Sequence, residues 1–358
     1  MTSIREQVAI DDLGHNRHRW ATLLWLGGSG CALAVVMVVA IGSGPVAVSP
    51  GVVARVVGHH VLGLPARPDW TAAQDAIVWL VRAPRVVLGA LVGAALAASG
   101  AVLQTLVRNV LADPHILGVT SGASTGAAAS LLFGAAASAA TLATSAFAGA
   151  LGATVLLYLV ARVDGQMTSL RLLLGGVTIG YIGSAATSFL VFASDTPEGA
   201  RAVLFWLLGS LASAAWSSVA ITALVTLGSL LGLLALATRF DALAAGDDTA
   251  RTLGLRPGRL RMLALAVVAL CVGAVVAVAG AVGFVGLVVP HVARLCVGGG
   301  HRRLIPLSAL FGALFLVSAD VVARIAFAPR ELPLGIVTAV VGAPLLLLLI
   351  RRSSRNVL

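Results

Sequence analysis

The residues of this sequence that could do chemistry are few, and many of them gather in one stretch, residues 239–261. The stretch reads RFDALAAGDDTARTLGLRPGRLR and contains five arginines and three aspartates, in a chain of which only 11% is charged. Apolar runs of membrane-spanning length precede and follow it, so the stretch must lie in water. We interpret it as the contact with whatever drives the protein, with a solvated loop as the alternative.

The second half of this stretch, residues 247–254, predicts a helix of about two turns. Asp247 is the expected N-cap, and Asp248 complements the partial positive charge at the start of the helix. Arg251 is spaced to pair back to Asp247, and Gly254 is placed to end the helix. Alanine and leucine on one side, with charges on the other, favour docking into a groove on another protein.

One acidic residue lies inside an apolar run. Asp320 falls in the apolar run near residues 304–327, the ninth along the chain, and Arg324 follows one helical turn later. An aspartate and an arginine at this spacing can neutralise each other within a membrane. The functional alternative is a proton or ion site, as in secondary transporters. A single acid beside an arginine is poorly suited to cycling protons, so we favour the structural ion pair.

The rest of the composition excludes several classes of function. All 24 basic residues are arginine, and a chain without lysine cannot form a P-loop for ATP. The three cysteines lie in apolar surroundings without metal-ligand spacing, and neither HExxH nor GxSxG occurs. The net charge of +10 is spread over short loops, which does not favour nucleic acid as a partner. We expect no catalytic residue, metal or cofactor on this chain.

The elements that must position these residues are membrane-spanning helices. Hydrophobic residues make up 59% of the 358 positions, which predicts an all-α polytopic membrane protein. A span takes about 20 apolar residues. Residues 1–20 then form an N-terminal segment, and residues 21–358 form a single transmembrane domain. The ten expected spans lie near residues 21–42, 85–107, 115–133, 139–161, 171–193, 217–237, 261–283, 285–297, 304–327 and 334–350, with a candidate half-helix at 204–211.

The arginines predict the orientation of these spans. With the N-terminus inside, seventeen of the 24 arginines fall on the inner side and seven on or near the outer side, as the positive-inside rule requires. Both termini and the 239–261 stretch are therefore expected in the cytoplasm, and the chain in the cytoplasmic (inner) membrane. Residues 44–79 become an outer segment, in which four prolines argue against a further buried helix.

A weak internal similarity is compatible with an inverted repeat. The sequence GAV followed by Pro-His occurs at 100–102 with 114–115 and again at 280–282 with 290–291. LGGVT at 174–178 resembles LGIVT at 334–338. The copies begin on spans of opposite direction, as an inverted repeat of four-span halves would require. Chance similarity in a sequence rich in glycine, alanine and valine is the alternative.

A series of motifs runs in order from Val81 to the C-terminus. They are RAPR at 82–85, Gly100 and Gln104, RNVLADP at 108–114, LLLGG at 172–176, Trp206 with GSL at 209–211, Gly246-Asp247 with Leu253-Gly254, GAVGFVGLVVPHVAR at 280–294, Ala319-Asp320, Arg324, ELPLG at 331–335 and GAP at 342–344. In this order they resemble the permease subunits of ABC importers for iron–siderophores, haem and cobalamin, the type II binding-protein-dependent importers. The family usually has proline where Val110 stands.

The resemblance implies a BtuC-like permease fold of ten helices and assigns roles to several groups of residues. The 239–261 stretch would be the coupling loop, seated on an ATPase through Gly246, Asp247, Asp248, Ala250, Arg251, Leu253 and Gly254. At the outer face, acidic residues of a substrate-binding lipoprotein would meet Arg82, Arg85 and Arg324, and Asp320 would orient Arg324. The inner gate on the translocation path would comprise Asn109, Leu111, Thr168, Ser169 and Leu170.

The resemblance also implies a function and an assembly. Two permease subunits, as a homodimer or a paralogous heterodimer, would surround a central path among membrane lipids. Two separate ABC ATPase subunits would bind ATP and Mg²⁺, and their closure would move the coupling loops. A ferric siderophore, the commoner cargo in the family, is the predicted substrate, with haem and cobalamin as alternatives. An ion-coupled secondary transporter that uses Asp320 is the alternative from another class.

Overall fold

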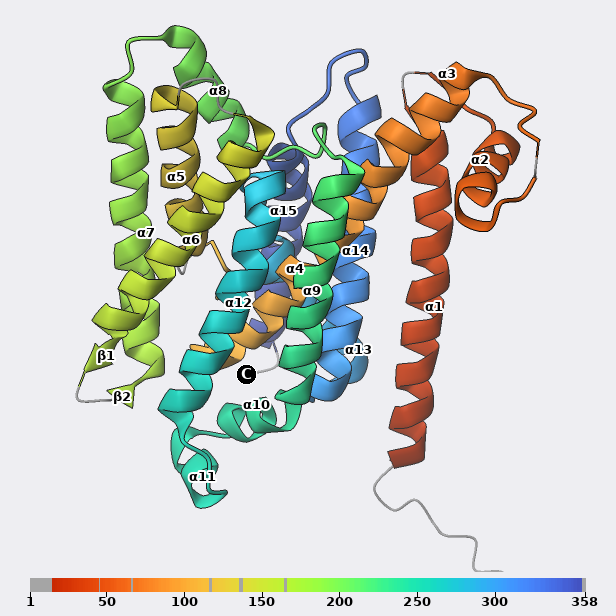
Figure 1. Cartoon of the computed structure of the whole chain (residues 1–358). Helices are drawn as coiled ribbons and strands as arrows, with labels where there is room; N and C mark the ends of the chain where they lie inside the picture. The colour runs from red at the N-terminus through yellow and green to blue at the C-terminus, as the bar shows by residue number, and fades with distance from the viewer. Residues whose placement is uncertain are drawn as a thin grey trace, which may run out of the picture.

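The computed structural model of the chain describes residues 15–44, 46–65, 67–115, 118–134, 138–163 and 166–355. Most of the predicted N-terminal segment, residues 1–20, lies outside this part. Helices occupy all ten predicted spans (Figure 1): α1 (His15–Gly42), α4 (Ala83–Leu106), α5 (Val119–Phe133), α6 (Ala139–Ala161), α7 (Ser169–Phe192), α9 (Trp216–Ala235), α12 (Pro257–Ala279), α13 (Val285–Val297), α14 (His301–Ile325) and α15 (Leu334–Arg355).

Seven helices among the described residues are long and apolar enough to cross a membrane. The other three predicted spans are filled by shorter apolar segments: α5 has 15 residues, α13 has 13, and the apolar part of α15 covers Leu334–Leu349. The chain is therefore an all-α polytopic membrane protein. The strands β1 (Arg162–Val163) and β2 (Gln166–Met167) form a small antiparallel pair between α6 and α7.

The predicted outer segment, residues 44–79, in which the prolines argued against a further buried helix, contains short helices. It holds α2 (Pro50–Leu62), α3 (Ala72–Asp75) and most of the π-helix η1 (Ala76–Arg82), which continues into α4. Helix α2 begins at Pro50, which stands in the first turn, where a helix needs no backbone N–H. The helix packs through the fully buried Val53 and Val56. Figure 1 places α2 beside the end of α1.

Short helices complete the connections. The predicted half-helix at 204–211 is α8 (Pro197–Leu207), which begins earlier and ends before Gly209. After α9 the chain forms α10 (Ala237–Ala244) and α11 (Asp247–Thr252), at the opposite end of the bundle from α2 and α8 (Figure 1). The acidic and basic stretch thus lies at one end of the bundle, which we call the α11 end, and the other is the α2 end.

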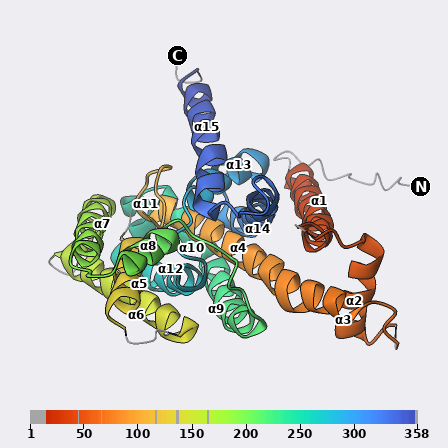
Figure 2. The same ribbon diagram turned by 90° about the horizontal axis from the view of Figure 1, so that it is seen from above.

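Helix α4 runs diagonally through the middle of the bundle, as Figures 1 and 2 both show. Twenty of its 24 residues are buried, against α9, α12, α13 and α14. Glycines permit the closest crossings, since a Cβ on Gly100 would collide with the backbone of Gly286 in α13, and one on Gly93 with Gly312 in α14. Close approach of backbones is how helices pack where lipid supplies no hydrophobic driving force.

Two groups of helices flank this core. Helices α5, α6 and α7 pack together on one side, and α1 lies on the other, against α14 and α2 (Figure 1). Helix α15 projects away from the bundle in the view of Figure 2. The similar segments in the sequence take up different local structures: Gly100 lies inside α4, whereas Gly280 follows the last residue of α12 with φ +70°. The inverted repeat stays a prediction.

Candidate functional site

The two short helices at the α11 end present the predicted coupling segment, residues 246–254. Gly246 separates them with φ +126°, a conformation that residues with a Cβ rarely adopt. Helix α10 is held by Phe240 and Leu243, both fully buried. In α11, Ala250 is buried, whereas the Asp248 side chain is 98% exposed and Leu253 is also exposed. The segment therefore packs through its small residue, and Asp248 and Arg251 are exposed to solvent.

A buried histidine fixes α10 to the membrane helices. The backbone N–H and Nδ1 of His301, at the start of α14, lie 2.9 and 2.6 Å from the same carboxylate oxygen of Asp241. The other ring nitrogen lies 2.8 Å from the Thr105 hydroxyl in α4. The histidine is 2% exposed. Through Asp241 and Thr105, His301 therefore connects α10 to α14 and α4.

The pairing within α11 differs from the predicted one. Gly246, not Asp247, occupies the N-cap position, and Arg251 pairs with Asp248 at 2.7 Å instead of with Asp247. The reason is that Asp247 is engaged elsewhere, by an arginine outside the helix. The predicted end of the helix is confirmed: Gly254 has φ +77°, and its N–H donates to the carbonyl of Arg251 at 2.9 Å.

Arg261, in α12, is a residue of this site to which no role of its own was assigned from the sequence. Its side chain is fully buried, and its guanidinium donates to both carboxylate oxygens of Asp247, at 2.6 and 2.9 Å. Hydrogen bonds from Arg261 are the main reason why the pKa of the Asp247 carboxyl lies below its usual range. Because that value is lowered, the pair loses its stabilising effect only as the pH falls below the carboxyl's ordinary titration range, and it is intact at neutral pH.

The predicted gate residues gather beside this pair. Ser169 begins α7 and its hydroxyl donates to the Leu106 carbonyl at the end of α4, at 3.0 Å. The Asn109 side chain accepts from the N–H of Leu111 at 2.9 Å, which forms the turn in which Val110 replaces the family's usual proline. Leu111 and Leu170 are exposed in this chain. The structure thus brings both predicted gate segments together at the α11 end, and their role as a gate stays a prediction.

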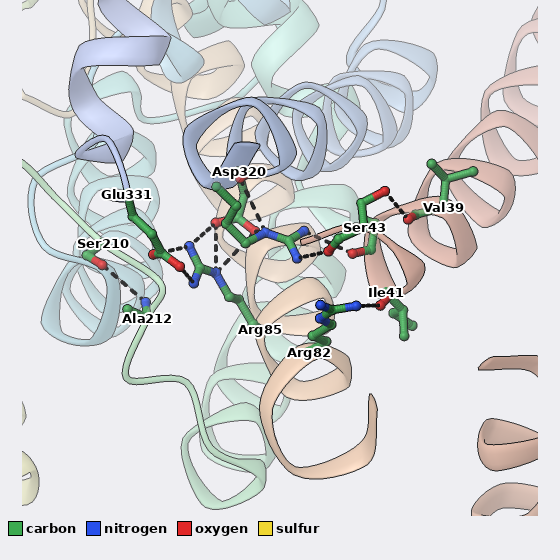
Figure 3. Close-up of polar contacts among 11 residues, drawn as sticks. Val39, Ile41, Ser43, Arg82, Arg85, Ser210, Ala212, Asp320 and Glu331 are labelled. Carbon is green, nitrogen blue, oxygen red and sulfur yellow. Dashed lines mark hydrogen bonds and ion pairs between the residues drawn. The ribbon is translucent and has the colours of Figure 1, made fainter. Parts of the chain in front are cut away.

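The three arginines predicted to meet a binding protein lie close together at the α2 end, but all are buried; Figure 3 labels Arg82 and Arg85. Arg82 donates to the carbonyls of Ile41 and Gly42, in the last turn of α1, and to that of Val46, just after the helix. Arg324 likewise reaches the carbonyls of Ala40 and Ser43. Their guanidinium groups are thus satisfied within the chain. A docking role remains a prediction, and it would require an incoming acid to compete with these acceptors.

Arg85 occupies the centre of an ion network around Asp320. Its guanidinium lies 2.8 Å from Asp320 and 2.9 Å from Glu331, in the connection between α14 and α15 (Figure 3). The predicted pair of Asp320 with Arg324 is present at 3.0 Å. Asp320 is 2% exposed and held between two arginines. The two guanidinium groups neutralise this carboxylate within the chain, which favours the structural interpretation over a proton site.

Comparisons with known proteins agree with this architecture. The model of the FecCD transport family matches residues 32–352. The cobalamin import system permease protein BtuC of Halobacterium salinarum is 46% identical over 276 residues, which cover 77% of this chain and 73% of that protein. The vitamin B12 import system permease protein BtuC of Vibrio cholerae is 41% identical over 285 residues, 79% of this chain and 85% of the relative.

A solved structure has the same fold. It is an inward-facing conformation of a transporter assigned to the metal-chelate type of ABC transporters, with a TM-score of 0.80 and 33% sequence identity. The match covers 91% of this chain and 98% of that one. The helices that position the coupling segment and the gate residues are therefore in the arrangement of a known transporter fold.

Proposed function

Because the chain belongs to the FecCD transport family, and is thus a permease subunit of an ABC importer, we propose that it carries cobalamin across the cytoplasmic membrane. ATP is hydrolysed by separate subunits of such importers, in keeping with a chain that has no lysine for a P-loop. One observation carries the choice of cargo: relatives named as cobalamin or vitamin B12 permeases are 41–46% identical over more than three quarters of this chain.

The proposed cycle uses both ends of the bundle. A loaded binding protein docks at the α2 end, with Arg82, Arg85 and Arg324 as the cations beneath its acidic residues. At the α11 end the coupling segment, residues 246–254, seats on an ATPase subunit. When the ATPase dimer closes on ATP, α11 contacts a different part of the ATPase surface. Work is transmitted to the permease only because the ATP-bound and ATP-free states contact α11 differently. A second permease copy or a paralogue completes the path, and this chain binds no cofactor of its own.

A ferric siderophore is the second candidate cargo. The solved structure with the same fold is assigned to the metal-chelate type, and cobalamin and ferric siderophores are both metal chelates. The siderophore was predicted because it is the commoner cargo of the family, and no residue of this chain favoured it. The names of the relatives shift the proposal to cobalamin. The ion-coupled alternative is disfavoured by family membership and by the two arginines that clamp Asp320.

Uptake in cells tests the cargo directly. The permease is expressed with its own ATPase and binding protein in a strain that lacks a cobalamin permease, and uptake of radiolabelled cyanocobalamin is measured. We expect uptake that excess unlabelled cobalamin competes and that excess ferric siderophore or haem does not. The control is the same complex with an ATPase that lacks its P-loop lysine. Accumulation of iron from a ferric siderophore, without cobalamin uptake, would overturn the proposal.

A further inference from the structure

We propose that the Arg261–Asp247 ion pair fastens the coupling helix α11 to the inner gate, so that helix and gate move as one body when the ATPase subunits close. The inference rests on the proposed function, in which α11 seats on an ATPase. Arg261 would act as a positioning residue: it contacts neither cargo nor nucleotide, and it transmits movement through Asp247.

The first support is that the hydrogen-bonding capacity of Arg261 is fully used. A guanidinium has five N–H donors. In this structure its donors make five contacts: two with the Asp247 carboxylate, and one each with the Leu106 carbonyl at 3.1 Å, the Met167 carbonyl at 3.1 Å and the Ser169 hydroxyl at 2.8 Å. A two-pronged contact with a carboxylate fixes orientation as well as distance. Arg261 therefore holds these groups in one relative geometry.

The second support is where the three remaining contacts lie. Leu106 is the last residue of α4 and leads into the turn that carries Asn109 and Leu111. Met167 and Ser169 flank Thr168, the residue that caps α7. Both predicted gate segments are thus bonded to the guanidinium that holds Asp247. One buried side chain joins α4, α7, α11 and α12.

The third support is that the other contacts between α11 and the gate are weaker, such as the longer-range attraction between Asp247 and Arg108. A cleft of about 340 Å³ opens between them, with Met167 and Thr168 on one side and Asp247, Arg251 and Leu255 on the other. Within the described part of the chain, the pair with Arg261 supplies the only side-chain hydrogen bonds from α11 to one of the long helices. Ala250 adds a buried methyl group but no directional contact. Without the pair, α11 could move into or out of the cleft while the gate stays in place.

A purely structural ion pair would give a different phenotype from a link. If the pair only stabilises the fold, its loss lowers the amount of active complex, and ATP hydrolysis and uptake fall together. If it is a link, the ATPase continues to work on a coupling helix that no longer moves the gate. The informative quantity is therefore the number of cobalamin molecules imported per ATP hydrolysed.

The first experiment measures this ratio in proteoliposomes that contain the whole transporter. For Arg261→Gln, which breaks the pair and leaves the coupling segment itself unchanged, we expect hydrolysis within about twofold of the unmodified complex and a ratio lowered at least about tenfold, in the usual range of coupling between sites. Arg261→Lys, which keeps the positive charge, should recover part of the ratio. The matched control is Asp69→Asn, which removes an exposed Arg–Asp pair (Arg55–Asp69, 3.0 Å) at the α2 end. An unchanged ratio, or a parallel fall of both activities, overturns the proposal.

The second experiment follows the link itself and needs no cargo. Spin labels are placed at Thr252 in α11 and Arg171 near the start of α7, both exposed, after the three cysteines have been replaced by alanine. When Asp247 is present, we expect the distance between the two spin labels of one subunit to be the same with and without ATP. In Asp247→Asn we expect this distance to differ between the ATP-bound and ATP-free states. A nucleotide-dependent distance in the native pair, or a constant distance in both proteins, overturns the link. A wrong cargo would leave this measurement unaffected.

Discussion

At the scale of single residues, buried charge is concentrated in two places, and in each an arginine satisfies groups from several helices. Asp320 is neutralised by Arg85 and Arg324, and Asp247 by Arg261. The spacing of Asp320 and Arg324 was enough to predict their pair, because residues four apart on a helix are neighbours. Arg85 is 235 positions from Asp320 and Arg261 is 14 from Asp247. Such partners depend on how helices pack, which local spacing does not encode.

The network around Asp320 yields a stability prediction. Asp320→Asn leaves two buried guanidinium groups with one acidic partner, Glu331, and removing one partner of a buried ion pair costs about 3–5 kcal/mol. We expect a clear fall in the thermal unfolding temperature of the purified protein. The control Glu331→Gln removes a partly exposed partner and should cost less. An unchanged unfolding temperature in Asp320→Asn, together with lost dependence of transport on a proton gradient, would restore the ion-site alternative.

At the scale of elements, hydrophobic runs predicted the long helices to within a few residues, because each must present about 20 apolar residues to lipid. The elements that the sequence missed or misplaced, α2 and α8, are short and begin with proline at a position that a helix accepts. Within the coupling segment, Gly254 ended the helix as predicted, whereas the pairing of Asp247 changed because a buried arginine on α12 outcompetes Arg251 in its own helix.

Helix α11 therefore offers two aspartates with different tasks, and Asp248 is the clean probe of the ATPase contact. Its side chain is almost fully exposed, whereas a change at Asp247 also disturbs Arg261. For Asp248→Arg we expect roughly tenfold weaker association with the ATPase, since reversing a charge at an interface juxtaposes like charges. Copurification of the ATPase with the tagged permease measures it. Asp195→Arg, an exposed acid before α8, is the matched control; equal retention in both variants would remove α11 from the ATPase contact.

At the scale of the whole molecule, ordered motifs predicted the family and the polytopic fold, and the comparisons confirm both. The motifs predicted the family because glycines at helix crossings, such as Gly100 against Gly286, recur wherever the same helices must approach closely. The cargo could not be predicted in the same way. The proposed path lies between two permease subunits, so the residues of one chain describe only one wall of it, and in the proposed cycle a separate binding protein delivers the cargo.

In the proposed function, ATP drives import by this permease through separate subunits. The most direct test uses liposomes that contain the permease and its ATPase, with the cobalamin-loaded binding protein outside and ATP enclosed. We expect uptake that requires enclosed ATP and persists when a protonophore collapses the proton gradient. Uptake without ATP that an imposed proton gradient drives, and that the protonophore abolishes, would contradict it.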